Sequence, residues 1–246
     1  MIQVVERASR ILTAFTRERP ELTLSECAES ANLTKSSAHR LLTSLAEVEL
    51  VERDGTHWRL GAGVVRLASV RLGHFDLRRE AVPRLRELGR VFRAAAAFSV
   101  PHGSEMVYLE RYESPEPIAA TAQLGARAPI WAGAAGQSVL AALPAEAREG
   151  RLDVPEWHGL PIATRKRVLE EIKRGERHRY VVDPGNFFAG IAGVAIAVRD
   201  HHDHPVAALS IISSPDRLSK AQAETIGARL VATADELEQF ARDWRV

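Results

Sequence analysis

The clearest candidates for a functional role are the polar and basic residues that follow position 33. They carry hydroxyl, imidazole and cationic side chains, namely Thr34, Lys35, Ser36, Ser37, His39 and Arg40. No acidic residue follows until Glu47, although acidic and basic residues are otherwise balanced over the first seventy positions. Arginine can form two hydrogen bonds with guanine in the major groove, and lysines and hydroxyls can bind phosphate oxygens. This run therefore predicts contact with double-stranded DNA.

Base contacts and phosphate contacts are expected from different residues. Ser36, Ser37 and Arg40 lie toward the start of a predicted helix, where side chains reach base edges. Phosphate contacts, which fix register without reading sequence, are expected from Thr34, Lys35, Arg53, His57, Arg59 and Arg7. His39 belongs to the same polar surface. A winged helix used for protein contacts would present a similar solvated helix, but it would not need the acid-free stretch.

Two helices are predicted ahead of this run. A first helix ending before Pro20 is indicated by apolar residues at three- and four-residue spacing, namely Val5, Ala8, Ile11, Leu12 and Phe15. Thr23 and Glu26 have the spacing of a capping box at the start of a second helix. The residues expected to be buried in that second helix are Leu24, Cys27, Ala28 and Ala31.

A tight turn should join the second helix to the third. Asn32 suits the left-handed position that ends a helix, and Thr34 can cap the next one. The third helix should bury Ala38, Leu41, Leu42 and Leu45. Asp54-Gly55 between two alternating runs then predicts a two-residue hairpin with a type I′ turn. Three helices and a hairpin form a winged helix-turn-helix.

Length and composition limit the class of protein. At 246 residues the chain can hold two domains, and its net charge of +1 confines any DNA-binding surface to a local patch. No apolar stretch approaches the roughly 20 residues that cross a bilayer, and the N-terminus lacks the features of a secretory signal. Cys27 is the only cysteine, which excludes an intramolecular disulfide. We expect a cytoplasmic protein without a membrane partner.

Enzyme and cofactor signatures are lacking in the sequence. The cluster His201-His202-Asp203-His204 has metal-binding residue types, but it lies between two predicted strands and is interpreted as a polar hairpin tip. The sequence contains no Gly-x-Ser-x-Gly elbow, P-loop or dinucleotide glycine fingerprint. We therefore expect no catalytic residues, no metal and no cofactor.

The remaining sequence alternates between helical and strand patterns. Helices are expected at 64–72, 77–92, 134–143, 163–173 and 220–240, the second despite Pro83. Strands are expected at 97–100, 106–110, 118–123, 180–182, 194–198 and 206–212. This mixture predicts an α+β domain.

The run from Val5 to Gly61 resembles the N-terminal domain of IclR-type regulators in order, spacing and turn chemistry. The similarity continues through residues 77–79, 107–111, 136–144, 180–183 and 207–210, so it covers nearly the whole chain. The resemblance implies a winged helix-turn-helix at 1–62, a linker helix at 63–78 and a GAF/PAS-like effector-binding domain at 79–246. It also implies a homo-oligomer, either a dimer or a dimer of dimers.

The same resemblance implies a pocket for a small organic acid effector. Its residue pattern is carried here by Trp131, Gly133, Ala134, Ala135, Asp183, Ile191, Gly193, Ser210 and Ile212. Residues 133–136 open a helix whose free backbone N–H groups and dipole favour a carboxylate. Ser210 can hydrogen-bond the same ligand.

Three residues depart from the family pattern. Members that bind very small polar acids commonly have Cys at the position of Gly193 and a polar residue at that of Ile212, which predicts a larger and drier pocket here. Trp131 replaces a small polar residue or His, and it is either a stacking wall for an aromatic ligand or a packing residue. We expect an aromatic or bulky apolar carboxylic acid, or a derivative such as an amide. The alternative is that these changes merely repack the core and that no effector binds.

The sequence thus predicts a DNA-binding transcriptional regulator, a repressor or an activator, whose operator affinity changes when an effector binds. Its target is expected to be a catabolic operon. Two alternatives are a GAF-like small-molecule-binding protein without effector-controlled DNA binding and, as a weaker one, a hydrolase.

Overall fold

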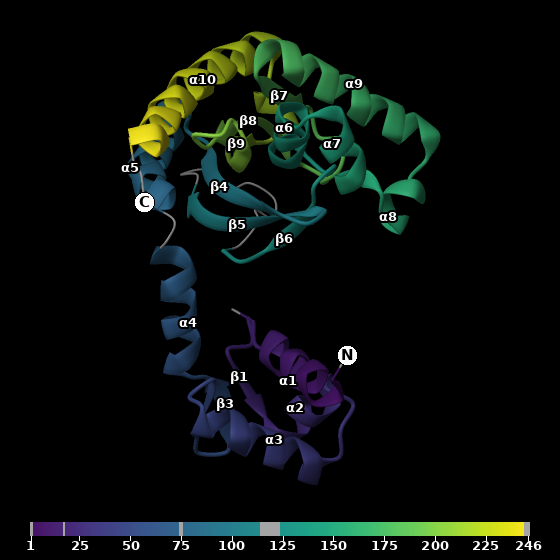
Figure 1. Ribbon diagram of the computed structural model, residues 1–246, viewed down its shortest axis with the longest axis vertical. Coiled ribbons are helices and arrows are strands. Elements are labelled where there is room, and N and C mark those ends of the chain that lie inside the picture. Colours follow the sequence, from purple (N-terminus) through teal and green to yellow (C-terminus); the bar gives the residue numbers. More distant parts are fainter. Residues whose placement is uncertain (1, 17, 74–75, 114–123, 244–246) are drawn as a thin grey trace. The chain divides into compact units, whose positions relative to one another are not determined.

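The computed structural model describes residues 2–16, 18–73, 76–113 and 124–243 (Figure 1). The chain divides into two compact units, Met1–Phe75 and Asp76–Val246. The predicted α+β class is confirmed: helices dominate the first unit, and a broad antiparallel sheet with flanking helices forms the second. The predicted strand at 118–123 lies outside the described residues.

The first unit is a winged helix-turn-helix. Its elements are α1 (Gln3–Ala14), β1 (Glu21–Thr23), α2 (Leu24–Ser30), α3 (Lys35–Glu47), β2 (Val51–Asp54), β3 (His57–Leu60) and α4 (Ala62–Gly73). The capping box is confirmed, because Thr23 N donates to Glu26 over 2.7 Å and Glu26 N donates to Thr23 Oγ1 over 3.3 Å. Asn32 has a φ of 52°, and Thr34 Oγ1 caps α3 by accepting from Ser37 N. Local side-chain chemistry therefore determines both helix starts.

The wing differs from the prediction in two respects. Asp54 pairs with His57, so Gly55 and Thr56 form the turn, and only Gly55 has a positive φ, of 58°. The type I′ turn centred on Asp54 and Gly55 is thus wrong by one residue, since glycine at the first central position is the type II′ pattern. In addition, β1 pairs with β3 as a third strand that the sequence reading missed, because three residues carry too little periodicity.

Apolar residues of α1, α2, α3 and the wing share one core, which includes Ile11, Cys27, Leu42, Val51 and Trp58. The residues predicted on the buried faces of the three helices are buried or half-buried, except Val5, which is exposed in the first turn of α1. The half-buried residues among them are Ala8, Leu12, Leu24 and Leu41.

The second unit is built on a sheet whose described strands run in the order β6-β5-β4-β9-β8-β7, with every pairing antiparallel. The strands are β4 (Ala95–His102), β5 (Glu105–Tyr112), β6 (Arg127–Pro129), β7 (Tyr180–Asp183), β8 (Ala192–Arg199) and β9 (Pro205–Ser213). The helices are α5 (Asp76–Phe92), α6 (Ala134–Ala142), α7 (Ala145–Leu152), α8 (Pro155–His158), α9 (Ile162–His178), η1 (Pro215–Arg217) and α10 (Lys220–Asp243). In the second unit, the described elements that the sequence did not predict are short, namely β6, α7, α8 and η1.

Helices cover the sheet, as Figure 1 shows, with α6 and α9 packed together over β7 and β8, and with α5 and α10 against each other. The strand face beneath α6 carries small side chains on three neighbouring strands. In register across β8, β9 and β4 lie Ala195, Ser210 and Ala97, and the next row contains Gly193, Ile212 and Ala95. Because most of these side chains are short, the space between this face and its covering segments is not filled.

None of the helices in the described ranges combines the length and apolarity that a membrane crossing requires.

Candidate DNA interface and ligand cavity

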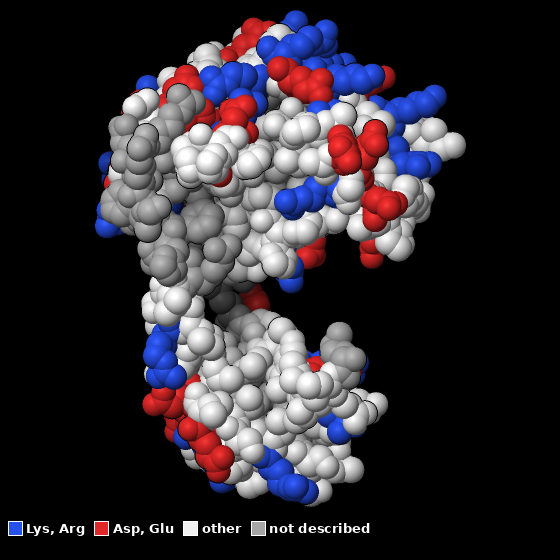
Figure 2. All heavy atoms as spheres, in the orientation of Figure 1, with Lys and Arg blue, Asp and Glu red and all other residues white. Residues whose placement is uncertain are grey.

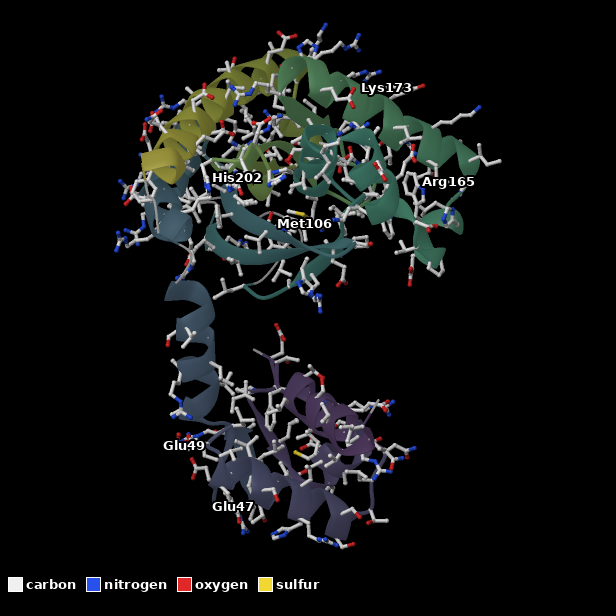
Figure 3. All side chains as sticks on the ribbon, viewed as in Figure 1. Glu47, Glu49, Met106, Arg165, Lys173 and His202 are labelled. Carbon is white, nitrogen blue, oxygen red and sulfur yellow. The ribbon has the colours of Figure 1, made fainter. Side chains whose placement is uncertain are left out.

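The polar residues of α3 form an exposed surface in the first unit. Lys35, Ser36, Ser37, His39 and Arg40 are all exposed, while Ala38 and Leu42 face the core. Figure 3 shows Glu47 and Glu49 at the end of α3 that leads into the wing. The acidic residues thus lie at the C-terminal end of the helix, and its N-terminal half is free of them. This arrangement suits entry of the N-terminal half into a major groove.

The start of α3 is a cluster of hydroxyl groups. Thr34 Oγ1 lies 3.1 Å from both Ser36 Oγ and Ser37 Oγ. Next to it, Ser37 and Arg40 of α3 and Arg7 of α1 line one groove of about 300 Å³. The structure therefore brings Arg7, predicted from a different helix, to the same surface as Arg40.

The wing residues are held by neighbouring groups. Arg59 Nε contacts Glu52 Oε1 at 2.6 Å, and Arg59 Nη1 lies 3.4 Å from Asp54 Oδ2. Two acidic partners offset the charge of this arginine, which would weaken a contact of Arg59 with a phosphate. Arg53 Nε donates to Gly55 O, and its guanidinium lies over the Trp58 ring at 5.9 Å.

His39 of α3 and His57 of the wing also contact neighbouring side chains. His39 meets the edge of Trp58 with ring centroids 6.3 Å apart, and His57 Nδ1 lies 3.2 Å from Thr56 Oγ1. Figure 2 shows acidic and basic side chains interspersed on the visible faces of both units. The basic character of the proposed DNA-binding surface is therefore local, at the start of α3, as the net charge required.

The second unit contains a cavity of about 340 Å³ between the small-residue strand face and the segments that cover it. Eight of the nine residues predicted for effector binding line it: Gly133, Ala134, Ala135, Asp183, Ile191, Gly193, Ser210 and Ile212. The volume lies in the lower part of the range of small-molecule sites, roughly 300–1,000 Å³. Residues from three strands, α6 and two loops, distant in sequence, thus meet at one site.

Trp131 is the exception among the nine. It does not line the cavity but is buried in the core, where its ring lies 6.0 Å from that of Trp157 in α8. This position fits the packing interpretation and not a stacking wall of the described cavity. The aromatic partner comes from α8, a helix that the sequence did not predict.

Asp183 is the one acidic side chain on the described cavity wall, and it is only 4% exposed. Its Oδ1 accepts hydrogen bonds from Gly185 N at 3.1 Å and Asn186 N at 2.9 Å. Its Oδ2 lies 3.8 Å from where a side chain at Gly133 would begin, at the start of α6. Burial raises the pKa of Asp183, although the two backbone hydrogen bonds oppose this effect.

Ser210 has a buried hydroxyl group on the cavity wall that could hydrogen-bond a ligand. The residue is 3% exposed and lines the cavity, and its Oγ has no hydrogen-bond partner among the described residues. A buried hydroxyl without a partner costs roughly 1–3 kcal/mol, so such groups are rare in folded proteins. A ligand that hydrogen-bonds this hydroxyl would remove that cost.

The sequence reading missed Tyr108 and Phe188, the two aromatic residues of the wall. Tyr108 alternates with Met106, which Figure 3 shows in the interior of the unit, so the period-two pattern of β5 could have indicated it. Burial raises the pKa of Tyr108, so its phenol remains neutral. Phe188 lies in a loop and has no comparable signal; its Cε2 is 3.6 Å from the position of a side chain at Gly133.

Arg127 also borders the cavity, but its charge is directed elsewhere. Its register partner is Val107, on the strand face opposite to that of Met106 and Tyr108. Its Nη2 pairs with Glu105 Oε2 at 2.8 Å on that opposite face. The described cavity wall is therefore apolar except for Asp183, Ser210 and the Tyr108 phenol, and no cationic head group points into it.

A winged helix-turn-helix in one unit and a ligand-sized cavity in the other are typical of DNA-binding regulators with a second, small-molecule-binding domain. Residues 4–55 match the IclR helix-turn-helix domain, and residues 70–239 match the bacterial transcriptional regulator IclR C-terminal domain. The chain belongs to the IclR family of DNA-binding transcriptional regulators, and the predicted resemblance is confirmed.

The sequences of related regulators match this chain over most of their lengths. The chain is 26% identical over 222 residues to the HTH-type transcriptional regulator KipR of Bacillus subtilis, covering 89% of this chain and 88% of that protein. It is 25% identical over 245 residues to the transcriptional repressor IclR of Escherichia coli, covering 96% and 89%. A solved IclR homologue from Microbacterium hydrocarbonoxydans, complexed with 4-hydroxybenzoate, shares 26% identity with a TM-score of 0.82, covering 98% of this chain and 100% of that one.

Proposed function

We propose that this regulator binds its operator through α3 and the wing, and that an aromatic or bulky apolar carboxylic acid, or an amide of one, modulates that binding from the cavity. We further propose that the operator belongs to a catabolic operon. The observation that carries the ligand proposal is the apolar 340 Å³ cavity with a buried, unpartnered Ser210 hydroxyl. The relative complexed with 4-hydroxybenzoate supports an aromatic acid as the ligand class.

The cavity offers separate surfaces to the two ends of such a ligand. At the polar end, Gly133 is the N-cap residue of α6, with a φ of 86° and no side-chain cap, so the first N–H groups of α6 can donate to a carboxylate. At the apolar end, Ile191, Ile212 and Phe188 can contact a ring. A side chain at Gly193 would begin 3.1 Å from Ile211 O and 4.0 Å from Ala134 Cβ, so it would occupy part of the cavity space between β8 and α6.

The first prediction concerns ligand size. Calorimetry should show benzoate or 4-hydroxybenzoate binding more tightly than glyoxylate or pyruvate, because two- and three-carbon acids leave the apolar wall without contacts. Each buried CH₂ equivalent contributes about 0.8 kcal/mol, so a ring should improve affinity by at least about 100-fold. Tighter binding of glyoxylate or pyruvate than of the aromatic acids would contradict the proposal.

The second prediction concerns Ser210. In Ser210→Ala the free protein should be no less stable than the wild type, because the substitution removes a buried hydroxyl that has no partner. Affinity for the aromatic acid should fall about 2- to 10-fold, the equivalent of one hydrogen bond. Thermal unfolding and calorimetry measure the two effects separately. A clear loss of stability without ligand would mean that the hydroxyl has a structural role instead.

Function as an oligomer is part of the proposal. One winged helix buries only about 600–1,000 Å² on DNA, so specific binding normally requires two copies at two half-sites. Within the first unit, the helix α4 exposes Val65, Leu67 and Val70, with Val65 70% exposed. Exposed apolar side chains along one helix support a contact with a second copy.

Effector control would then act through the arrangement of the two copies. Ligand binding can change operator affinity only by the difference in ligand affinity between the DNA-binding and non-binding arrangements. Operator titrations by gel shift, with and without saturating aromatic acid, measure this difference. Tight ligand binding that leaves operator affinity unchanged would favour a small-molecule-binding protein without effector-controlled DNA binding.

A further inference from the structure

The charge environment of Asp183 restricts how the cavity can accept an acid. Asp183 is the one buried carboxyl on the described wall, and Arg127, the one cationic residue there, is paired with Glu105 at 2.8 Å on the opposite face of the strands. The first turn of α6 has no acidic residue, and the lining residues of β8 and β9 are uncharged. From β5, Tyr108 adds a neutral phenol. A ligand carboxylate would therefore meet a second carboxylate without a positive side chain between them.

The charged groups behind Asp183 do not alter this conclusion. On α9, Arg167 lowers the pKa of Asp183, but its Nη1 is bound to Asn186 Oδ1 at 3.0 Å. Glu171, on the same helix, interacts with Asp183 unfavourably and is paired with Arg174 at 2.7 Å. Neither group lines the cavity. Two carboxyl groups that share a buried site cannot both ionise without a large cost, and they commonly hold one proton between them.

We propose that Asp183 binds the effector through a shared proton, so that each monocarboxylate entering the cavity brings one proton from solvent and dianions are excluded. In the complex, the proton lies between Asp183 Oδ2 and one ligand oxygen, while the other ligand oxygen can accept from the start of α6. No covalent bond forms or breaks. This inference rests on the proposed function, because it takes the ligand to be an acid bound in this cavity.

The proton shared between Asp183 and the ligand determines which ligands the cavity can accept. A primary amide carries its own N–H donor and can satisfy Asp183 without a proton from solvent. An aromatic dicarboxylate would require a second proton or leave a charge unpaired in an apolar site. The cavity should therefore accept benzoate and benzamide and reject phthalate.

Proton uptake can be measured directly by calorimetry. Benzoate and 4-hydroxybenzoate would be titrated into the full-length protein in phosphate and in Tris buffers, whose ionisation heats differ. We expect about one proton taken up per ligand at pH 8, and an affinity that falls by up to about tenfold per pH unit as the pH rises, because the complex binds the extra proton. Benzamide should bind without proton uptake and with little pH dependence.

Asp183→Asn and Glu171→Gln form a matched pair of variants. The first replaces the carboxyl by an amide that supplies a donor at any pH, so benzoate should bind without proton uptake and independently of pH. The second removes the neighbouring carboxyl behind the wall and should retain the wild-type proton uptake. Thermal unfolding of both variants verifies that they fold.

The possible outcomes separate this inference from the proposed function. Wild-type binding of benzoate without proton uptake, or uptake that persists in Asp183→Asn, would overturn the shared proton and leave the aromatic-acid proposal intact. Binding of phthalate as tightly as benzoate would also overturn it. Failure of benzoate, 4-hydroxybenzoate and benzamide alike to bind would refute the proposed ligand class itself.

Discussion

Replacing Arg40 with alanine is expected to abolish most of the operator specificity while leaving the protein folded. Arg40 is exposed on α3, shares a groove with Arg7, and has no acidic partner among the described residues. A bidentate arginine–guanine pair contributes about 1–3 kcal/mol, and a symmetric dimer would lose it at both half-sites. Operator affinity should therefore fall by at least about 30-fold, measured by fluorescence anisotropy at fixed salt.

Arg59→Ala is the matched control for this experiment. It removes the same side chain from the same unit, but the charge of Arg59 is already offset by Glu52 and Asp54. Its effect on operator affinity should stay below about threefold, which is consistent with a minor phosphate contact. An equal loss for Arg40→Ala on operator and scrambled DNA would reassign Arg40 to phosphate binding. A larger loss for Arg59→Ala would mean that the wing, and not α3, dominates recognition.

Gly136→Ala is expected to destabilise the second unit severely. A side chain at this position would begin 2.0 Å from the carbonyl oxygen of Ile130, and the atoms that it meets belong to the backbone and not to a flexible side chain. Overpacking in a core costs about 1–3 kcal/mol, and a backbone clash belongs at or above the upper end. At about 2–4 °C per kcal/mol for a unit of this size, the melting temperature should fall by roughly 10 °C. Ligand binding should be lost with it, because the start of α6 forms part of the cavity wall.

Gly150→Ala provides a control of opposite sign. Gly150 lies within α7, and a side chain there would meet nothing within 4 Å. Alanine in a helix interior is favoured over glycine by roughly 0.5–1 kcal/mol, so this variant should melt slightly higher than the wild type. Differential scanning calorimetry compares the two. A Gly136→Ala protein that unfolds like the wild type would show that the approach of α6 to residue 130 is not required.

Features that depend on residues close together in the sequence were predicted correctly, whereas features that depend on distant residues were not. The capping box of Thr23 and Glu26, the left-handed Asn32 and the Thr34 cap each depend on atoms within a few residues, and all three are confirmed. The turn at Gly55 was misplaced by one residue because strand register depends on the pairing partner as well as on the turn residues. Elements of three to eight residues, such as β1 and α8, carry too little periodicity to be predicted.

By itself, the sequence determined the winged helix-turn-helix, the acid-free polar surface of its third helix and half of the residues that line the cavity. Periodicity and capping are local, and the family pattern supplied the lining residues before any distance was known. Only the tertiary structure decided that Trp131 packs on Trp157, that Arg127 points away from the cavity, and that Arg59 is paired with two acids. It alone showed a buried Asp183 in a wall whose one cationic residue, Arg127, is paired with Glu105. The physical reason is that burial and the direction of a charge depend on neighbours distant in the chain, which no local pattern encodes.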